Sequence, residues 1–118
     1  MNASGAPLLA LLVENDHLQR ETLAAALASE NLDVIECASA AAAELIVSRI
    51  GTELQVLIVD LWLSNEPDGA ELARYAAQQH PRLRILVISG DEDLALPEKV
   101  CFIRKPYSPA DVVSAAVA

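Results

Sequence analysis

Apolar residues fall into short continuous runs separated by longer segments in which apolar residues recur every three or four positions. Runs of this length, rich in Leu, Ile and Val, are typical of strands that are buried on both faces of a sheet. The pattern therefore predicts five strands: Leu8–Val13, Asp33–Ala38, Leu54–Val59, Ile85–Ile88 and Val100–Ile103.

The segments between these runs have the helical period. Asp16–Ser29, Ala40–Ile50 and Gly69–His80 are predicted helices, and a last helix begins at Ser108-Pro109-Ala110-Asp111. There a hydroxyl can cap the helix, proline suits its first turn, and an acid meets its positive end. The alternation of strands and helices predicts an α/β fold, a doubly wound five-stranded parallel sheet with helices on both faces. We expect residues 1–118 to form a single domain.

The link between the fourth and fifth strands is too short for an ordinary crossover helix. It consists of residues 90–99 and contains Pro97. A crossover between parallel strands normally needs about a dozen residues or more, and proline stops a helix. We expect the fourth helix of the alternating pattern to be shortened to a single turn or missing.

Polar groups stand at the ends of four predicted strands. These are the segment Glu14-Asn15-Asp16, Asp60, Ser89 and Lys105. Because the carboxyl ends of parallel strands share one edge of a sheet, these groups should lie close together. Acids, an amide, a hydroxyl and an ammonium are the groups needed to hold a divalent cation and transfer a phosphoryl group.

Composition narrows the possible partners and the possible cellular location of the protein. The net charge is −9 and the eight Lys and Arg residues are scattered, which argues against nucleic acid as a partner. No apolar run reaches the roughly 18–20 residues that span a membrane, and residues 1–7 lack the basic start of a signal peptide. Cys37 and Cys101 lie in apolar strands, so we expect buried free thiols in a cytoplasmic protein.

Five short motifs in order give the whole chain a specific resemblance. It resembles a receiver domain of the two-component response-regulator family, whose sheet order is 2-1-3-4-5. The matching motifs are Val13-Glu14-Asn15-Asp16, Ile58-Val59-Asp60, Pro67-Asp68-Gly69-Ala70-Glu71-Leu72, Leu86-Val87-Ile88-Ser89-Gly90 and Phe102-Ile103-Arg104-Lys105-Pro106-Tyr107.

The resemblance assigns chemical roles to three residues. Asp60 would be the nucleophile that accepts a phosphoryl group from a histidine kinase or phosphotransferase. Lys105 would pair with Asp60, aimed by a cis Lys105–Pro106 peptide, and Ser89 would bind a phosphate oxygen. Ser89 and Phe102 would form the switch that reports phosphorylation. No other cofactor than Mg²⁺ is implied.

The resemblance also implies a Mg²⁺ site. Its ligands would be Glu14, Asn15, Asp60 and the backbone carbonyl of Trp62. The family usually has two acids after the first strand, so a neutral Asn15 should weaken Mg²⁺ binding. The neighbouring Asp16 could compensate, but we favour a helix-capping role for it. Trp62 should lie near the mouth of the site and could shield an acyl phosphate from water.

Other functions fit the sequence less well. Asn15 motivates the main alternative, a phosphorylation-independent pseudo-receiver that acts as a binding module. A phosphohydrolase would need a second acid two residues after the nucleophile, where Trp62 stands. A flavin site would need a phosphate-binding loop where Glu14-Asn15-Asp16 would repel phosphate. We therefore expect a signalling protein rather than an enzyme, a monomer or weak dimer that acts on a downstream protein by contact.

Overall fold

Five parallel strands form one sheet in the order β2-β1-β3-β4-β5, as predicted. The computed structural model describes residues 6–64, 66–90 and 96–118. The strand bounds depart from the predicted ones by no more than two residues. They are β1 Leu8–Val13, β2 Leu32–Cys37, β3 Val56–Asp60, β4 Arg84–Ser89 and β5 Cys101–Arg104.

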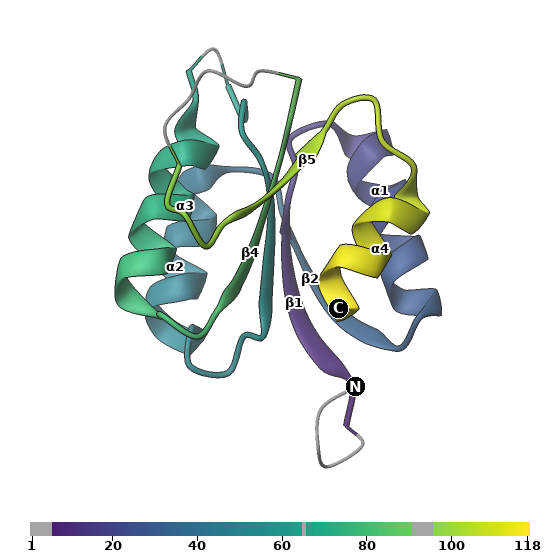
Figure 1. Ribbon diagram of the computed structural model, residues 1–118, viewed down its shortest axis with the longest axis horizontal. Coiled ribbons are helices and arrows are strands. Elements are labelled where there is room, and N and C mark those ends of the chain that lie inside the picture. The colour runs from purple at the N-terminus through teal and green to yellow at the C-terminus, as the bar shows by residue number, and fades with distance from the viewer. Residues whose placement is uncertain (1–5, 65, 91–95) are drawn as a thin grey trace.

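Four helices cover the two faces of the sheet in the described part of the chain (Figure 1). They are α1 His17–Ser29, α2 Ala40–Ile50, α3 Asp68–Gln79 and α4 Pro109–Val117. Helices α2 and α3 cover one face, and α1 and α4 cover the other. This is the doubly wound arrangement that the sequence predicted.

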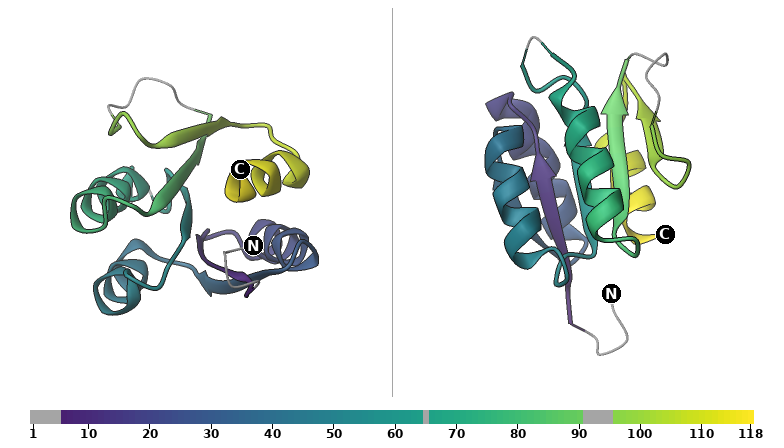
Figure 2. Two further views of the ribbon diagram at one scale, coloured as in Figure 1. Left: turned by 60° about the horizontal axis from the view of Figure 1, so that its bottom comes forward. Right: turned by 90° about the vertical axis from the view of Figure 1, so that its left-hand side faces the viewer.

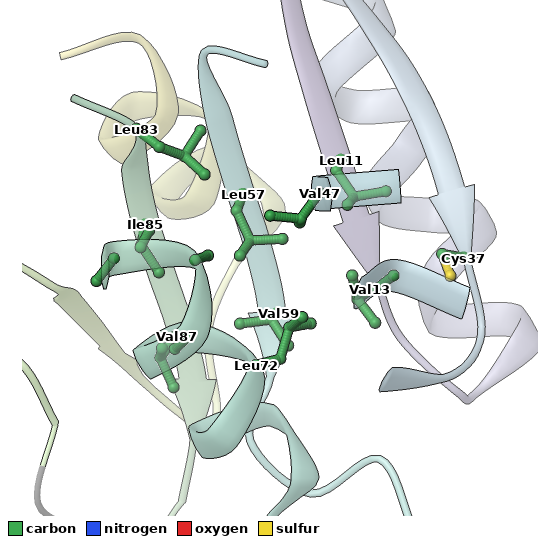
Figure 3. Close-up of a cluster of buried hydrophobic side chains, with 14 of the residues drawn as sticks. Leu11, Val13, Cys37, Val47, Leu57, Val59, Leu72, Leu83, Ile85 and Val87 are labelled. Atoms are coloured by element: carbon green, nitrogen blue, oxygen red, sulfur yellow. The ribbon is translucent and has the colours of Figure 1, made fainter. Parts of the chain in front are cut away.

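Alternating side chains of each central strand fill two separate cores. On β1, Leu11 and Val13 pack toward α2 and α3, where Figure 3 shows them beside Leu57 and Val59 of β3. The intervening residues of β1 join the core beneath α1 and α4. Because successive side chains of a strand point to opposite faces, strands that are covered on both sides are apolar throughout.

Polar side chains cap the starts of helices α1, α2 and α4. The side chain of Asp16 accepts a hydrogen bond from the backbone N–H of Gln19 (2.8 Å), so the predicted capping role of Asp16 is confirmed. Ser39 caps α2 in the same way. Ser108 and Asp111 form a reciprocal capping box at the start of α4. Such caps satisfy N–H groups that have no partner within the helix.

Strand β5 lies at the edge of the sheet and is less buried than its sequence suggested. Cys37 is buried as expected, but the prediction that Cys101 is buried was wrong: it is exposed. The reason is that β5 has four residues and pairs only with β4. Between these strands, Gly90 and residues 96–100 contain no helix; the rest of the expected shortened helix falls in 91–95, outside the described residues.

None of the helices within residues 6–64, 66–90 and 96–118 is both long and apolar enough to cross a bilayer.

Candidate functional site

The predicted polar groups meet at the carboxyl edge of the sheet, where all the strand arrows point (Figure 2). Asp60 is the last residue of β3 and Ser89 the last residue of β4. Glu14 directly follows β1, and Lys105 directly follows β5. The parallel sheet therefore brings together residues that are as much as 91 positions apart, from 14 to 105.

Asp60 forms a short ion pair with Lys105. The Asp60 side chain is 5 % exposed, and its Oδ2 lies 2.7 Å from Lys105 Nζ. Its Oδ1 accepts a hydrogen bond from the backbone N–H of Trp62 (3.1 Å). Lys105 is tied to β4 by a bond from its N–H to the Ser89 carbonyl (3.0 Å), and the Lys105–Pro106 peptide is cis, as the resemblance implied. Both carboxylate oxygens are thus held in place.

Glu14 is a second buried carboxyl group beside Asp60. Glu14 is 5 % exposed, and its Oε2 accepts a hydrogen bond from the Asp16 N–H (3.1 Å). The pKa of Glu14 is raised from 4.5 to about 7, mainly by burial and in part by the neighbouring Asp60, while the Asp16 N–H and Lys105 act to lower it. Two buried carboxyl groups thus share one ammonium, and the site is short of positive charge.

The donor set at this edge suits a hard cation. Mg²⁺ takes oxygen ligands, commonly one or two carboxylates together with water. Glu14 and Asp60 can supply the carboxylates, and an added cation would relieve their mutual repulsion. No group of three or more His, Cys, Asp or Glu side chains with metal-binding geometry occurs in the described ranges. Two carboxylates with water as further ligands are a donor set that Mg²⁺ accepts, so Glu14 and Asp60 fit such a site.

The other predicted site residues differ in their surroundings. Ser89 is buried, with 1 % of its surface exposed, whereas Asn15 is exposed beside Glu14. Trp62 is 39 % exposed just after β3. Phe102 is 36 % exposed and is aligned with Val87 of β4. Ser89 is thus buried at the carboxyl edge of the sheet, whereas the side chains of Trp62 and Phe102 are in contact with solvent.

Arg20 is a supporting residue that the sequence did not single out. Its Nη1 donates to the backbone carbonyl of Glu14 (2.8 Å), and its Nε lies 3.7 Å from a carboxylate oxygen of Glu36 on β2. The guanidinium therefore ties the Glu14 segment to α1 and to the edge strand. An arginine within α1 carries no sequence signal of this role, because its partner is a backbone carbonyl.

Tyr107 borders the site from the loop after β5. Burial raises the pKa of Tyr107, and the negative charges of Glu14 and Asp60 raise it further. Tyr107, Lys105 and Pro106 line a cavity together with Leu18 and Leu23 of α1. The carboxyl edge is therefore flanked by an apolar hollow.

Comparison with known proteins identifies relatives over nearly the whole chain. The family model of the response regulator receiver domain matches residues 10–116. The sensor kinase CckA of Brucella abortus (strain 2308) is 31 % identical over an alignment of 104 residues, which covers 83 % of this chain and 11 % of that kinase. The chain thus spans about a tenth of the length of this relative.

Solved structures show the same fold at low sequence identity. A response regulator receiver protein from Sinorhizobium medicae WSM419 superposes with a TM-score of 0.82 at 22 % identity, covering 94 % of this chain and 92 % of that one. The structure of the CheX–CheY–BeF₃–Mg²⁺ complex from Borrelia burgdorferi superposes with a TM-score of 0.81 at 19 % identity, and the match covers 97 % of this chain and 90 % of that one.

Proposed function

Because the chain belongs to the family of response regulator receiver domains, we propose that it is a phosphoacceptor of two-component signalling, modified on Asp60. The observation that carries this proposal is the 2.7 Å ion pair between Asp60 and Lys105, with a second buried carboxyl group, Glu14, beside it. The family model places the chain in a class of signalling modules. The acceptor residue and its phosphodonor are our inference.

The transfer would proceed by direct attack of the carboxylate. One oxygen of Asp60 forms a bond to phosphorus while the bond from phosphorus to the donor breaks, and the donor leaves with that electron pair. The donor would be the phosphohistidine of a histidine kinase or of a histidine phosphotransferase. The ammonium of Lys105 and the hydroxyl of Ser89 would stabilise the charge on the phosphoryl oxygens.

Mg²⁺ would be held by Glu14, Asp60 and the backbone carbonyl of Trp62, with the amide oxygen of Asn15 as a further donor. When bound, the ion would neutralise the negative charge that otherwise opposes contact between a carboxylate and a phosphoryl group. Asn15 brings no charge to the site. We infer that Mg²⁺ binds more weakly here than it would beside two acids.

The output would be a change in protein contacts. Ser89 would move toward the new phosphate, and Phe102, 36 % exposed on the edge strand, would change its exposure. We infer a downstream protein partner and a monomer or weak dimer. The two free thiols, Cys37 and Cys101, suit a cytoplasmic location. Similarity to part of a sensor kinase supports a histidine kinase or phosphotransferase as the other partner.

The test is intact-mass spectrometry after incubation with acetyl phosphate, with Mg²⁺ or with EDTA. We expect a Mg²⁺-dependent gain of one phosphoryl group in the wild type and no gain in Asp60→Asn, which keeps the shape of the side chain. Asn15→Asp should reach the same gain at lower Mg²⁺ concentration.

A specific observation favours one alternative, a phosphorylation-independent binding module. Asn15 leaves the site with one charge fewer than the family pattern, and Glu14 holds its proton up to a pH of about 7. If neither acetyl phosphate nor a phosphorylated histidine kinase adds a phosphoryl group to the wild type, while Asn15→Asp accepts one, this alternative replaces the proposal.

A further inference from the structure

A second cavity lies at the end of the sheet opposite to Asp60. Its volume is about 590 Å³, and it is lined by the starts of β1, β4 and β5 and by the end of α4. Its apolar walls include Leu8, Leu83 and Val117. Three cationic side chains, Arg82, Arg84 and Lys99, line the same cavity.

This concentration of positive charge is unusual for the chain. The protein carries 17 acidic and eight basic residues, yet three of those eight basic residues surround one cavity. None of the three forms an ion pair with a carboxylate among the residues described here. Like charges that are gathered around one cavity repel one another, and an anion bound between them would reduce that cost.

Backbone contacts hold two of these cations in place. Lys99 Nζ donates to the carbonyl of Pro81 (2.7 Å), which is the residue before Arg82. Arg84 Nη1 donates to the Ala115 carbonyl of α4 (3.3 Å). Each bond uses one donor of a group that has several, so the remaining N–H groups can still bind a ligand. The cationic heads are therefore partly ordered before any ligand arrives.

We propose that this cavity, lined by Arg82, Arg84 and Lys99, is a docking site for an acidic, apolar-containing segment of a partner protein. The guanidinium groups suit carboxylates, which they can bind through two parallel hydrogen bonds. The walls formed by Leu8, Leu83 and Val117 suit apolar side chains between the carboxylates. This site does not involve Asp60, so it does not depend on the proposed phosphorylation.

The chemistry of the cavity favours a protein segment over other anions. Inorganic phosphate would leave the apolar walls unfilled. A nucleic acid presents a long row of phosphates, and a chain with a net charge of −9 repels them outside this one patch. Because charges more than about 8 Å apart are largely screened at physiological salt, a short acidic segment in this cavity is repelled less by the rest of the acidic surface than a long nucleic acid would be.

The experiment is titration of the ¹⁵N-labelled protein, monitored by NMR. The probe is a terminally blocked peptide of alternating Glu and Leu, and its counterpart carries Gln in place of Glu. We expect the Glu peptide to shift the amide signals of Arg82, Arg84 and Lys99, while the Gln peptide does not. The Arg82 side chain forms no hydrogen bond or ion pair with another described residue, so Arg82→Gln should leave the fold intact and weaken binding by about tenfold.

Arg49→Gln is the matched control, because Arg49 is exposed on α2 and its replacement changes the net charge equally. The proposal is overturned if the Glu peptide shifts none of these amides, or if Arg49→Gln weakens binding as much as Arg82→Gln. It is also overturned if pyrophosphate or a single-stranded oligonucleotide binds this cavity more tightly than the peptide, since the ligand class would then be different.

Discussion

Gly69 packs directly against the backbone of Asp60. A β-carbon at residue 69 would overlap the Asp60 carbonyl oxygen and would lie 2.8 Å from the α-carbon of Leu61. The Gly69 N–H donates to the Leu61 carbonyl at 2.9 Å. The first turn of α3 is therefore fixed against the end of the strand that carries the acceptor, and only glycine permits this approach.

Replacing Gly69 with alanine should disturb both stability and phosphorylation. The atoms in the way belong to the backbone, so α3 or the Asp60 segment must shift. We expect Gly69→Ala to lower the free energy of unfolding by about 1–3 kcal/mol, measured by urea denaturation, and to slow the reaction with acetyl phosphate. Gly90→Ala is the control, because among the described residues its β-carbon would meet only the Lys105 Cβ, at 4.0 Å. Equal stability of the two variants would refute this account of Gly69.

Removing the ammonium of Lys105 should slow phosphoryl transfer. Lys105→Met keeps the length of the side chain but loses the charge that faces Asp60 Oδ2. We expect the rate of phosphorylation by acetyl phosphate to fall by about 10²-fold, the typical effect of losing one charge-stabilising donor. Lys99→Met is the control, since Lys99 is exposed and lines the opposite end of the sheet. Similar rates in the two variants would rule out this role for Lys105.

The raised pKa of Glu14 predicts a specific dependence of stability on pH in the absence of Mg²⁺. The folded protein holds this proton up to a pH of about 7, whereas the unfolded chain releases it near 4.5. Between these values the folded state binds more protons, so the free energy of unfolding falls as pH rises, by up to about 3 kcal/mol. Below 4.5 the contribution is fully present.

Glu14→Gln isolates this effect, because other titrating groups contribute to both proteins. Urea denaturation of the two proteins in EDTA, across pH 4.5 to 7, should show a decline in the wild type that is absent or smaller in the variant. Parallel stability curves would show that Glu14 does not titrate in this range. The same proton competes with a cation, so Mg²⁺ affinity of the wild type should rise over this range of pH.

Trp62 should protect the phosphorylated state from water. Its backbone N–H binds Asp60 Oδ1, and its side chain is 39 % exposed. We expect Trp62→Ala to lose its phosphoryl group faster than the wild type, and Trp62→Phe to resemble the wild type. Loss of mass over time after removal of acetyl phosphate measures the decay. Leu45→Ala removes an exposed apolar side chain on α2 and should have no effect; an unchanged decay in Trp62→Ala would contradict the shielding role.

Arg20 should support cation binding although it cannot be a ligand. Its bond to the Glu14 carbonyl holds the segment that carries Glu14, so Arg20→Gln should lower Mg²⁺ affinity. Trp62 is the sole tryptophan and lies next to the site, so its fluorescence can report Mg²⁺ binding. Arg49→Gln should leave the affinity unchanged. A loss of affinity in both variants would point to net charge rather than to positioning.

The sheet, and the polar residues at its carboxyl edge, could be predicted from the sequence because both follow from local patterns. Strand β1 is apolar throughout and β3 is apolar up to its last residue, Asp60, and that pattern identifies a doubly covered parallel sheet. Parallel strands then bring Glu14, Asp60 and Lys105 to one edge. The Asp16 cap was also predictable, because capping depends only on the next few residues.

Features that depend on packing could not be predicted. Cys101 was expected to be buried, yet it is exposed on the edge strand β5. The strand order implied by the resemblance places this strand at the edge, but a short apolar run does not reveal how far its neighbours cover it. The close approach of Gly69 to Asp60 and the bond from Arg20 to the Glu14 carbonyl both involve backbone atoms of another segment. Such contacts are fixed by the arrangement of helices on the sheet.

The most direct test of the central claim is to locate the phosphoryl group by borohydride reduction and peptide mass spectrometry. Borohydride converts an aspartyl phosphate into homoserine and leaves free carboxylates unchanged. After reaction with acetyl phosphate and Mg²⁺, we predict homoserine at residue 60 alone. Homoserine at another acidic residue, or none in a protein that has gained the phosphoryl mass, would show that Asp60 is not the acceptor.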